Sequence, residues 1–196
     1  MADSLAPDDV RPLLRGRFGA RYRYAAVCES TQRLFADADP EGTVSATEEQ
    51  TQGRGRLGRA WRAPRGTSVL MSIVLEPAVE PDRLPELSLL AGEAVARAVA
   101  SETGASPTVR FPNDVLIDGR KVAGILAEAS GGRVVLGIGI NANQDADQLP
   151  AGAETPPVSL RLATGHAVDR ARLLAAVLAE LEAGYDAWVT GHAASG

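Results

Sequence analysis

The pair Asp118-Gly119 is the sequence feature that most constrains the fold. It stands between two apolar runs in NDVLIDGRKVAGILAE, residues 113–128. An Asp-Gly pair in this position favours a two-residue turn with positive φ at both residues, and such a turn joins antiparallel strands. The turn also sets the register, in which we predict the pairs Ile117 with Arg120, Leu116 with Lys121, and Asp114 with Ala123.

Lys121 stands out in this hairpin because it is the only lysine among 20 cationic residues, the rest being arginine. Side chains alternate along strands, so we expect Asp114, Leu116, Lys121 and Ala123 on one face. Asp114 and Lys121 are then diagonal neighbours at about 7–8 Å, within reach of a lysine stem. Taken alone, such a pair is more often a structural salt bridge. A carboxylate and an ammonium flanked by Leu116 and Ala123 also suit a functional site.

Apolar patterns elsewhere predict further strands and helices. The run at residues 67–76 is short for a buried helix and predicts a strand covered on both faces. Residues 84–100 place apolar side chains at helical spacing, and Gly104 is expected to end that helix. Residues 131–141 predict another strand, and Asp169 is expected to cap a last helix. Strands and helices intermixed around a hairpin indicate an α/β or α+β class with a mixed sheet.

The segment GRGRLGRAW, residues 53–61, has the composition of an anion-binding loop. Five arginines fall within residues 54–65 of a chain whose net charge is -5. Glycines let backbone amides turn toward an anion, and guanidinium groups bind phosphate or carboxylate through two parallel hydrogen bonds. The letters also fit GxGxxG, but no apolar strand precedes them and no helical pattern follows, so a dinucleotide fold is not supported.

One face of the predicted strand at residues 134–141 carries Gly137, Gly139 and Asn141. Glycine weakens a strand, so its presence indicates close approach by another backbone or a ligand. Asn141 and Asn143 at the strand's end are placed to hydrogen-bond a base or a ribose. An ordinary turn role for Asn143 is equally compatible with the sequence.

Composition bounds the class of protein. The chain has 196 residues and 45% hydrophobic content, which suits one compact domain. Its acidic balance disfavours a protein that wraps nucleic acid, and the single cysteine excludes an internal disulfide and a CxxC metal site. The first residues lack an apolar signal core, and no apolar run is long enough to span a bilayer. We therefore expect a cytoplasmic protein that binds neither DNA nor membranes and has no metal site of its own.

Four stretches together resemble the bacterial biotin–protein ligases, which share a catalytic fold with lipoate–protein ligases. They are ESTQ at residues 29–32, Gln50 followed by residues 53–61, FPNDVLIDGRKVAGILAE at residues 111–128, and GINAN at residues 139–143. Their order and spacing are those of the family, and the resemblance covers about residues 24–190. The pairing of GRGRxGRxW with a downstream PND…RKxAGIL is the specific part.

The resemblance implies an α+β catalytic domain, a mixed sheet backed by helices, that uses biotin and Mg-ATP. Such a domain makes biotinyl-5′-adenylate and passes the biotinyl group to a lysine of the biotin carboxyl carrier domain of a carboxylase. Carried onto this chain, the resemblance and the strand pattern give the following candidates: for biotin, Ser30, Thr31, Gln32, Gln50, Gly53, Arg54, Gly55, Arg56, Lys121 and Gly124; for ATP, Arg54, Arg56, Trp61, Asn113, Lys121, Asn141 and Asn143. The candidate catalytic residues are Lys121, Arg54, Arg56 and Asp114. For Asp114, orienting or deprotonating the acceptor lysine and pairing with Lys121 remain open alternatives, and Trp61 is either a nucleotide contact or core packing.

Three departures from the family pattern affect these expectations. Gln32 stands where the family usually has Asn, and Arg110-Phe111 replaces Lys-Trp. We expect residues 1–196 to form a single catalytic domain with a lead-in at residues 1–23, without the family's N-terminal DNA-binding domain or its small C-terminal β-domain. A lipoate or octanoate ligase and a non-catalytic biotin or adenylate sensor are the alternatives, and the sequence leaves a homodimer open.

Overall fold

A computed structural model describes residues 3–193. Its centre is a mixed seven-stranded sheet in the order β1-β2-β3-β7-β6-β5-β4. The strands are β1 (Tyr22–Ala25), β2 (Val44–Thr47), β3 (Ser68–Leu75), β4 (Thr108–Arg110), β5 (Asp114–Ile117), β6 (Arg120–Ser130) and β7 (Arg133–Asn141). β1 and β2 run parallel and the other neighbours antiparallel. The mixed sheet of the α+β prediction is confirmed.

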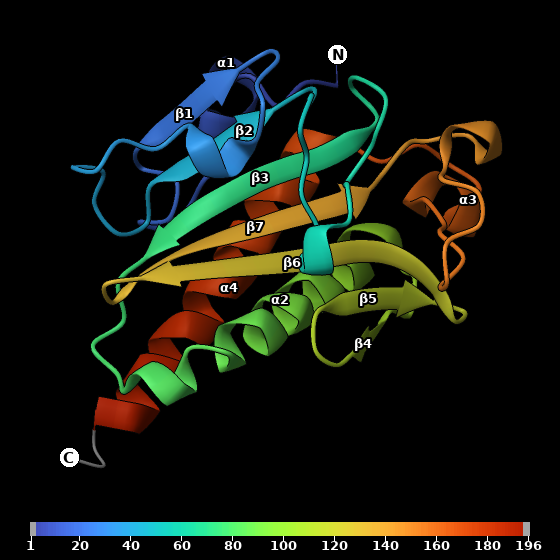
Figure 1. Cartoon of the computed structure of the whole chain (residues 1–196). Coiled ribbons are helices and arrows are strands. Elements are labelled where there is room, and N and C mark those ends of the chain that lie inside the picture. Colours follow the sequence, from blue (N-terminus) through green and yellow to red (C-terminus); the bar gives the residue numbers. More distant parts are fainter. Residues whose placement is uncertain (1–2, 194–196) are drawn as a thin grey trace.

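Two long helices cover one face of this sheet (Figure 1). The helices are α1 (Pro7–Val10), α2 (Glu86–Thr103), α3 (Leu160–Thr164) and α4 (Arg170–Ala193). As predicted, Gly104 ends α2 with a positive φ of 71°, and the Asp169 carboxylate accepts from the Arg172 backbone N–H at the start of α4. Across the opposite face of the sheet passes the loop between β2 and β3 (Figure 1).

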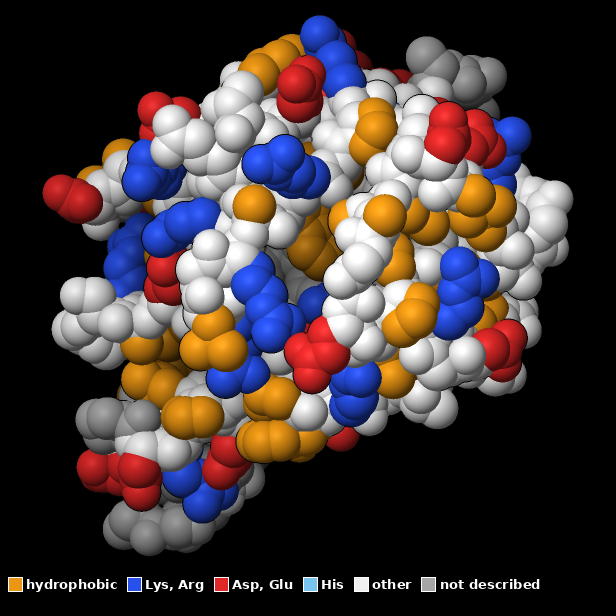
Figure 2. Space-filling model, turned by 45° about the vertical axis from the view of Figure 1, so that its right-hand side comes forward, with side chains coloured by type: hydrophobic (Ala, Val, Ile, Leu, Met, Phe, Trp, Pro, Cys, Tyr) orange, Lys and Arg blue, Asp and Glu red, His pale blue; other side chains and the backbone are white. Residues whose placement is uncertain are grey.

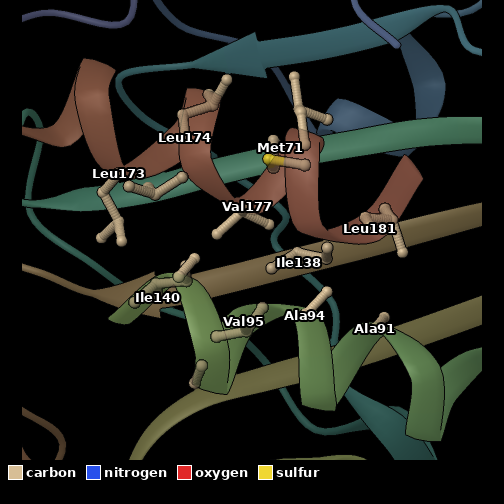
Figure 3. Close-up of a cluster of buried hydrophobic side chains, with 14 of the residues drawn as sticks. Met71, Ala91, Ala94, Val95, Ile138, Ile140, Leu173, Leu174, Val177 and Leu181 are labelled. Carbon is tan, nitrogen blue, oxygen red and sulfur yellow. The ribbon is translucent and has the colours of Figure 1, made fainter. Parts of the chain in front are cut away.

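The hydrophobic core lies between the sheet and the two long helices. Figure 3 shows Met71, Ile138 and Ile140 of the sheet facing Val95 of α2 and Val177 of α4. Every residue of β3 is buried, which confirms the strand predicted to be covered on both faces. In β7, Val134, Leu136, Ile138 and Ile140 are buried as the predicted core face. The other face of β7 is therefore free to form a site.

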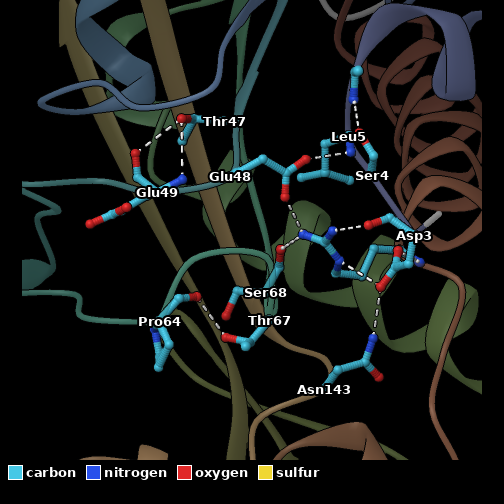
Figure 4. A network of polar contacts seen from close by, with 12 residues as sticks. Asp3, Ser4, Leu5, Thr47, Glu48, Glu49, Pro64, Thr67, Ser68 and Asn143 are labelled. Atoms are coloured by element: carbon cyan, nitrogen blue, oxygen red, sulfur yellow. Dashed lines mark hydrogen bonds and ion pairs between the residues drawn. The ribbon is translucent and has the colours of Figure 1, made fainter.

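The segment predicted as a lead-in contributes to the same core. Leu5, Val10 and Phe18 are all buried, and the Leu5 backbone N–H donates to the Glu48 carboxylate. Figure 4 shows this region, where Asp3, Leu5 and Glu48 lie side by side. The guanidinium of Arg170, whose side chain is 1% exposed, bridges Asp3 and Glu48 at 2.8 and 2.7 Å. A buried cation between two carboxylates ties this segment to the start of α4.

The hairpin has the predicted turn and a register that changes partway along it. Asp118 and Gly119 both have positive φ, 50° and 73°. Leu116 pairs with Lys121 and Ile117 with Arg120 as predicted, but Asp114 pairs with Gly124 and not with Ala123. The reason is a β-bulge at Val122, one extra residue in β6, which reverses the alternation beyond it. Ala123 therefore faces the core, and placing it beside Lys121 was wrong.

None of the described helices is both long enough and apolar enough to cross a membrane.

Candidate active site

Three glycines on β6 and β7, Gly124, Gly137 and Gly139, form the floor of the site, which we call the glycine floor. Gly124 and Gly139 pair across the two strands, and Gly137 follows along β7. The indole of Trp61 lies directly on this floor: a Cβ added to Gly139 would come within 2.6 Å of Trp61 Cε2, and one on Gly124 within 3.0 Å of Cζ3. The strand glycines thus do allow a close approach, but a side chain, that of Trp61, makes it here and not another backbone.

An inner compartment of about 50 Å³ lies behind Trp61. Its wall includes Ser30, Thr31 and Gln50, three of the predicted biotin residues. Gln50 Oε1 accepts from the Thr31 backbone N–H at 2.8 Å, and the Thr31 hydroxyl contacts the Ser72 hydroxyl at 2.7 Å. These bonds hold η2 (Thr31–Arg33), a 3-10 helix of one turn, against β3 and give the compartment a fixed polar end.

Gln32, the departure from the usual asparagine, lies across Gly137. A Cβ added to Gly137 would meet Gln32 Nε2 at 3.3 Å. Gln32 Nε2 donates to the Leu126 carbonyl oxygen at 3.2 Å, and its Oε1 accepts from Arg54 at 3.2 Å. Arg54 also donates to Glu128 at 2.6 Å. Gln32 therefore links residues 53–61, which we call the arginine loop, to β6. It also closes one side of the inner compartment.

An outer compartment of about 560 Å³ opens on the other side of Trp61. The boundary between the two compartments is formed by side chains that line both: Lys121, Arg56, Trp61 and Asn113. Arg56, on the 3-10 turn η3 (Arg56–Gly58), donates to the Asn113 side-chain oxygen at 3.1 Å. Lys121 Nζ lies 5.8 Å from the centre of the Trp61 ring. Two cations thus lie where the compartments meet.

Lys121 and Asp114 form the ion pair that the hairpin predicted, with Nζ 2.6 Å from Oδ1. Arg110 binds the other carboxylate oxygen of Asp114. Burial acts to raise the pKa of Asp114, but hydrogen bonds from Lys121 and Arg110 outweigh it and hold the pKa below its ordinary value. Asp114 is therefore ionised at neutral pH, and its charge is shared by two cations.

The backbone of Lys121 is clamped from the side opposite β5. Its N–H donates to the Pro156 carbonyl oxygen at 2.8 Å, and its carbonyl oxygen accepts from the Val158 N–H at 2.9 Å. Asn141 donates to the carbonyl oxygens of both Lys121 and Val158, at 3.5 and 3.3 Å. The predicted Asn141 thus lies in the wall of the outer compartment and also supports Lys121.

Gln144 is a supporting residue that the sequence analysis missed. It is 1% exposed, and its Nε2 donates to Asn141 Oδ1 at 3.1 Å and to the Ser68 hydroxyl at 2.7 Å. The nearest sequence signal is its place directly after the GINAN stretch at residues 139–143. A glutamine in a predicted loop has no pattern that distinguishes it from a solvent-exposed one.

Asn143 and Gly53 do not line either compartment among the described residues. The Asn143 amide donates to the Val168 carbonyl oxygen at 2.9 Å, and its oxygen accepts from the Val168 N–H at 2.8 Å. The structure thus favours the turn role for Asn143. Gly53 packs under the Trp61 backbone, where an added Cβ would lie 2.4 Å from the carbonyl oxygen.

Comparisons with known proteins agree with this architecture. Residues 24–145, more than half of the chain, match the model of the biotin/lipoate A/B protein ligase family. The chain belongs to this family. Its members among characterised proteins include the "Bifunctional ligase/repressor BirA" of Bacillus subtilis, which is 35% identical over 181 residues, 88% of this chain and 56% of the relative. The "Biotin--[acetyl-CoA-carboxylase] ligase" of Mycobacterium tuberculosis is 39% identical over 160 residues, 80% of this chain and 59% of the relative.

Solved structures of biotin/lipoate A/B ligases have the same fold. The biotin protein ligase from Aquifex aeolicus in complex with biotin and ATP superposes with a TM-score of 0.76 at 32% identity, covering 84% of this chain and 70% of the other. The Leishmania major biotin protein ligase in complex with biotinyl-5-AMP has a TM-score of 0.67 at 22% identity, covering 83% of this chain and 73% of the other, and supports the fold alone. The chain spans a little over half the length of the two sequence relatives named above.

Proposed function

We propose that this chain is a biotin–protein ligase: it joins biotin to AMP and then transfers the biotinyl group to a lysine of a biotin carboxyl carrier domain. The observation that carries the proposal is the position of Lys121 and Arg56 at the boundary of two compartments. Adenylation must bring a carboxylate and a triphosphate together, and cations at their meeting point are what that step requires.

In the first half-reaction a biotin carboxylate oxygen attacks the α-phosphorus of ATP, and pyrophosphate leaves. The inner compartment would hold the biotin ring system, with Thr31 and Gln50 at its polar end, and the outer compartment would hold the nucleotide. Lys121 and Arg56 neutralise the carboxylate and the α-phosphate, and alignment of the two anions supplies much of the rate. Arg54 belongs to the same loop and lines the inner compartment.

The inner compartment must widen to hold biotin, because ligand pockets are commonly about 300–1,000 Å³. Its cover consists of Trp61 and the arginine loop, which side-chain bonds such as Arg54 to Glu128 and Arg56 to Asn113 connect to β6 and to the turn before β5. We infer that residues 53–61 move outward as biotin enters and return over the adenylate.

In the second half-reaction the neutral amine of the acceptor lysine attacks the carbonyl carbon of the mixed anhydride, and AMP leaves. Asp114 is a weak base, since Lys121 and Arg110 hold its pKa below the ordinary value. We assign it the role of fixing the Lys121 ammonium by the 2.6 Å contact. The amine proton then passes to solvent or to the departing phosphate.

Magnesium belongs to this proposal as part of the Mg-ATP substrate. Lys121 and Arg56, the two charged side chains that line both compartments, are cationic. No group of three or more His, Cys, Asp or Glu placed to hold a metal occurs among residues 3–193. These two cations fit the anionic triphosphate, and Mg²⁺ would enter with it as Mg-ATP. We place the reaction in the cytoplasm, where ATP and the carboxylases are found.

Biotin-dependent exchange of labelled pyrophosphate into ATP tests the proposal. We expect exchange with biotin and none with lipoate or octanoate. Exchange that depends on lipoate would instead identify the sister activity. Biotin binding without exchange would identify a sensor and refute the ligase.

A further inference from the structure

Leu57 and Phe111 are the two most exposed large hydrophobic side chains of the described residues, at 86% and 77%. The next, Val27, is 44% exposed. We propose that these two side chains, with Arg59, Arg62 and Arg110, form a docking rim for the acceptor domain, an acidic protein that presents its lysine beside apolar residues. This inference rests on the proposed ligase function and adds to it the surface that selects the protein substrate.

Leu57 lines the outer compartment, and Phe111 stands between Arg110 and Asn113, which also line it, although 54 positions separate Leu57 from Phe111 (111 − 57). Leu57 follows Arg56, whose guanidinium donates to the Asn113 side chain at 3.1 Å, and Phe111 lies two residues before Asn113. Both segments adjoin the outer compartment, which Arg110 and Asn113 line. We infer from this hydrogen bond between the neighbouring residues Arg56 and Asn113 that the two exposed side chains lie near the same edge of the opening.

The left-handed backbone conformation of Leu57 is not compensated by packing of its side chain within the fold. Its φ is 57°, a left-handed conformation that glycine or asparagine adopts more easily than a leucine. Its side chain is almost fully exposed, so burial of leucine within this chain does not compensate for the conformation. An apolar side chain held outward in this way is available to a partner.

Access to the reacting groups requires a partner to rest on this rim. Side chains of Asp114 and Lys121 are only 13% and 28% exposed. An acceptor lysine must therefore insert its four-carbon stem to reach a mixed anhydride held beside Lys121. The residues next to that lysine are then pressed against the edge of the opening, where Leu57 and Phe111 lie.

The charge of the rim favours an acidic partner. Arg59, Arg62 and Arg110 all line the outer compartment, within a chain whose net charge is -5. Within residues 3–193, the ion-pair partner of Arg59 is the highly exposed Glu154, at 3.3 Å. Figure 2 shows Lys and Arg side chains gathered around a hollow on this side of the molecule, with hydrophobic side chains exposed among them. Opposite charge steers association, and apolar contacts add affinity at the centre of an interface.

The test compares two nucleophiles in three variants of the full chain. The carrier domain of a bacterial acetyl-CoA carboxylase must dock, whereas hydroxylamine attacks the same anhydride carbon, releasing AMP, without docking. Leu57→Asn removes the apolar side chain and suits the positive φ, so any loss is not due to backbone strain. Phe111→Ser removes the second side chain, and Leu162→Ser, at a 40% exposed leucine of α3, is the matched control.

We expect Leu57→Asn and Phe111→Ser each to raise the KM for the carrier domain about tenfold or more, as expected for loss of a buried apolar contact. In Phe111→Ser, pyrophosphate exchange and hydroxylamine trapping should stay within about twofold of wild type. Leu57 lies on the loop that covers the site, so for Leu57→Asn the loss with the carrier domain is compared with the loss with hydroxylamine in the same variant, and we expect the first to be about tenfold larger. Added salt should raise the carrier KM. An unchanged carrier KM with normal exchange would overturn the docking rim alone. A change of sedimentation in these variants, without a change in the carrier KM, would assign the surface to a second copy of this chain and overturn it too. Absence of exchange in the wild type would refute the proposed function and, with it, this inference.

Discussion

Gly139→Ala tests the stacking of Trp61 on the glycine floor. The substitution adds one methyl group to a strand residue. The backbone conformation of Gly139 suits any amino acid, but the neighbouring Trp61 side chain leaves no room for a Cβ. The new Cβ would lie 2.6 Å from Trp61 Cε2 and 2.8 Å from Cζ2. Carbon atoms are stable in contact at about 3.5–4.0 Å, so the indole must retreat by about 1 Å.

That displacement should affect both stability and catalysis. Overpacking of this kind costs about 1–3 kcal/mol, so we expect the free energy of unfolding to fall by that amount. Trp61 separates the two compartments and lies beside Lys121, with Nζ 5.8 Å from the ring centre. A shift of about 1 Å in a positioning group costs about 100-fold in rate, so kcat/KM for pyrophosphate exchange should fall by about 10- to 100-fold.

Three measurements check this expectation: urea unfolding, biotin-dependent pyrophosphate exchange, and the indole N–H resonance of Trp61. Gly191→Ala is the control, because a Cβ there meets nothing within 4 Å. Trp61→Phe removes the fused ring and should restore part of the stability lost in Gly139→Ala, with a coupling of about 0.5–3 kcal/mol. Wild-type stability and exchange in Gly139→Ala, or strict additivity with Trp61→Phe, would refute the packing described here.

Three further predictions concern charged and amide side chains of the site. Lys121→Arg replaces a compact ammonium group with a planar guanidinium, and we expect the rate of pyrophosphate exchange to fall by about 100-fold or more. A near-normal exchange rate would show that Lys121 does not take part in the reaction. The pKa of Asp114 is lowered by folding, so its ionised form stabilises the protein above about pH 4 and this contribution disappears as pH falls through the folded-state pKa. Asp114→Asn should therefore flatten the acid limb of an unfolding-versus-pH curve, and an unchanged limb would contradict the ion pair. Asn143→Ala should lower the free energy of unfolding by about 1–3 kcal/mol through the lost Val168 bonds while the KM for ATP stays constant; a raised KM with unchanged stability would instead support nucleotide contact.

The hairpin shows how far local sequence rules reach. Asp118-Gly119 predicts the turn because the conformations of two residues decide it, and the structure has both positive φ angles. The bulge at Val122 has no such local cause. Next to it, Lys121 is hydrogen-bonded on the side opposite β5 to the segment that contains Pro156 and Val158, which is distant in the sequence. The bulge turns Gly124 toward the site in place of Ala123.

The asparagines show the same limit in another way. Asn141 and Asn143 are two residues apart, and both were candidates for a nucleotide contact, with a turn role left open for Asn143. In the structure Asn141 faces the outer compartment and supports Lys121, whereas Asn143 bonds the Val168 backbone. Their difference depends on which segments return to the end of β7. Val158, which Asn141 contacts, lies 17 residues further along the chain, and Val168, which Asn143 contacts, lies 25 residues further along.

The sequence alone determined that Lys121 and Asp114 share a hairpin, that glycines line one face of β7, and that arginines gather in one loop. Each of these follows from turn geometry, strand alternation or composition, which act over a few residues. Only the tertiary structure decided what lies on the glycine floor, which cations stand between the compartments, and which buried amides hold Lys121. Trp61, Arg56 and Gln144 reach their places through contacts between segments far apart in the chain, and the packing of the whole sheet selects those contacts.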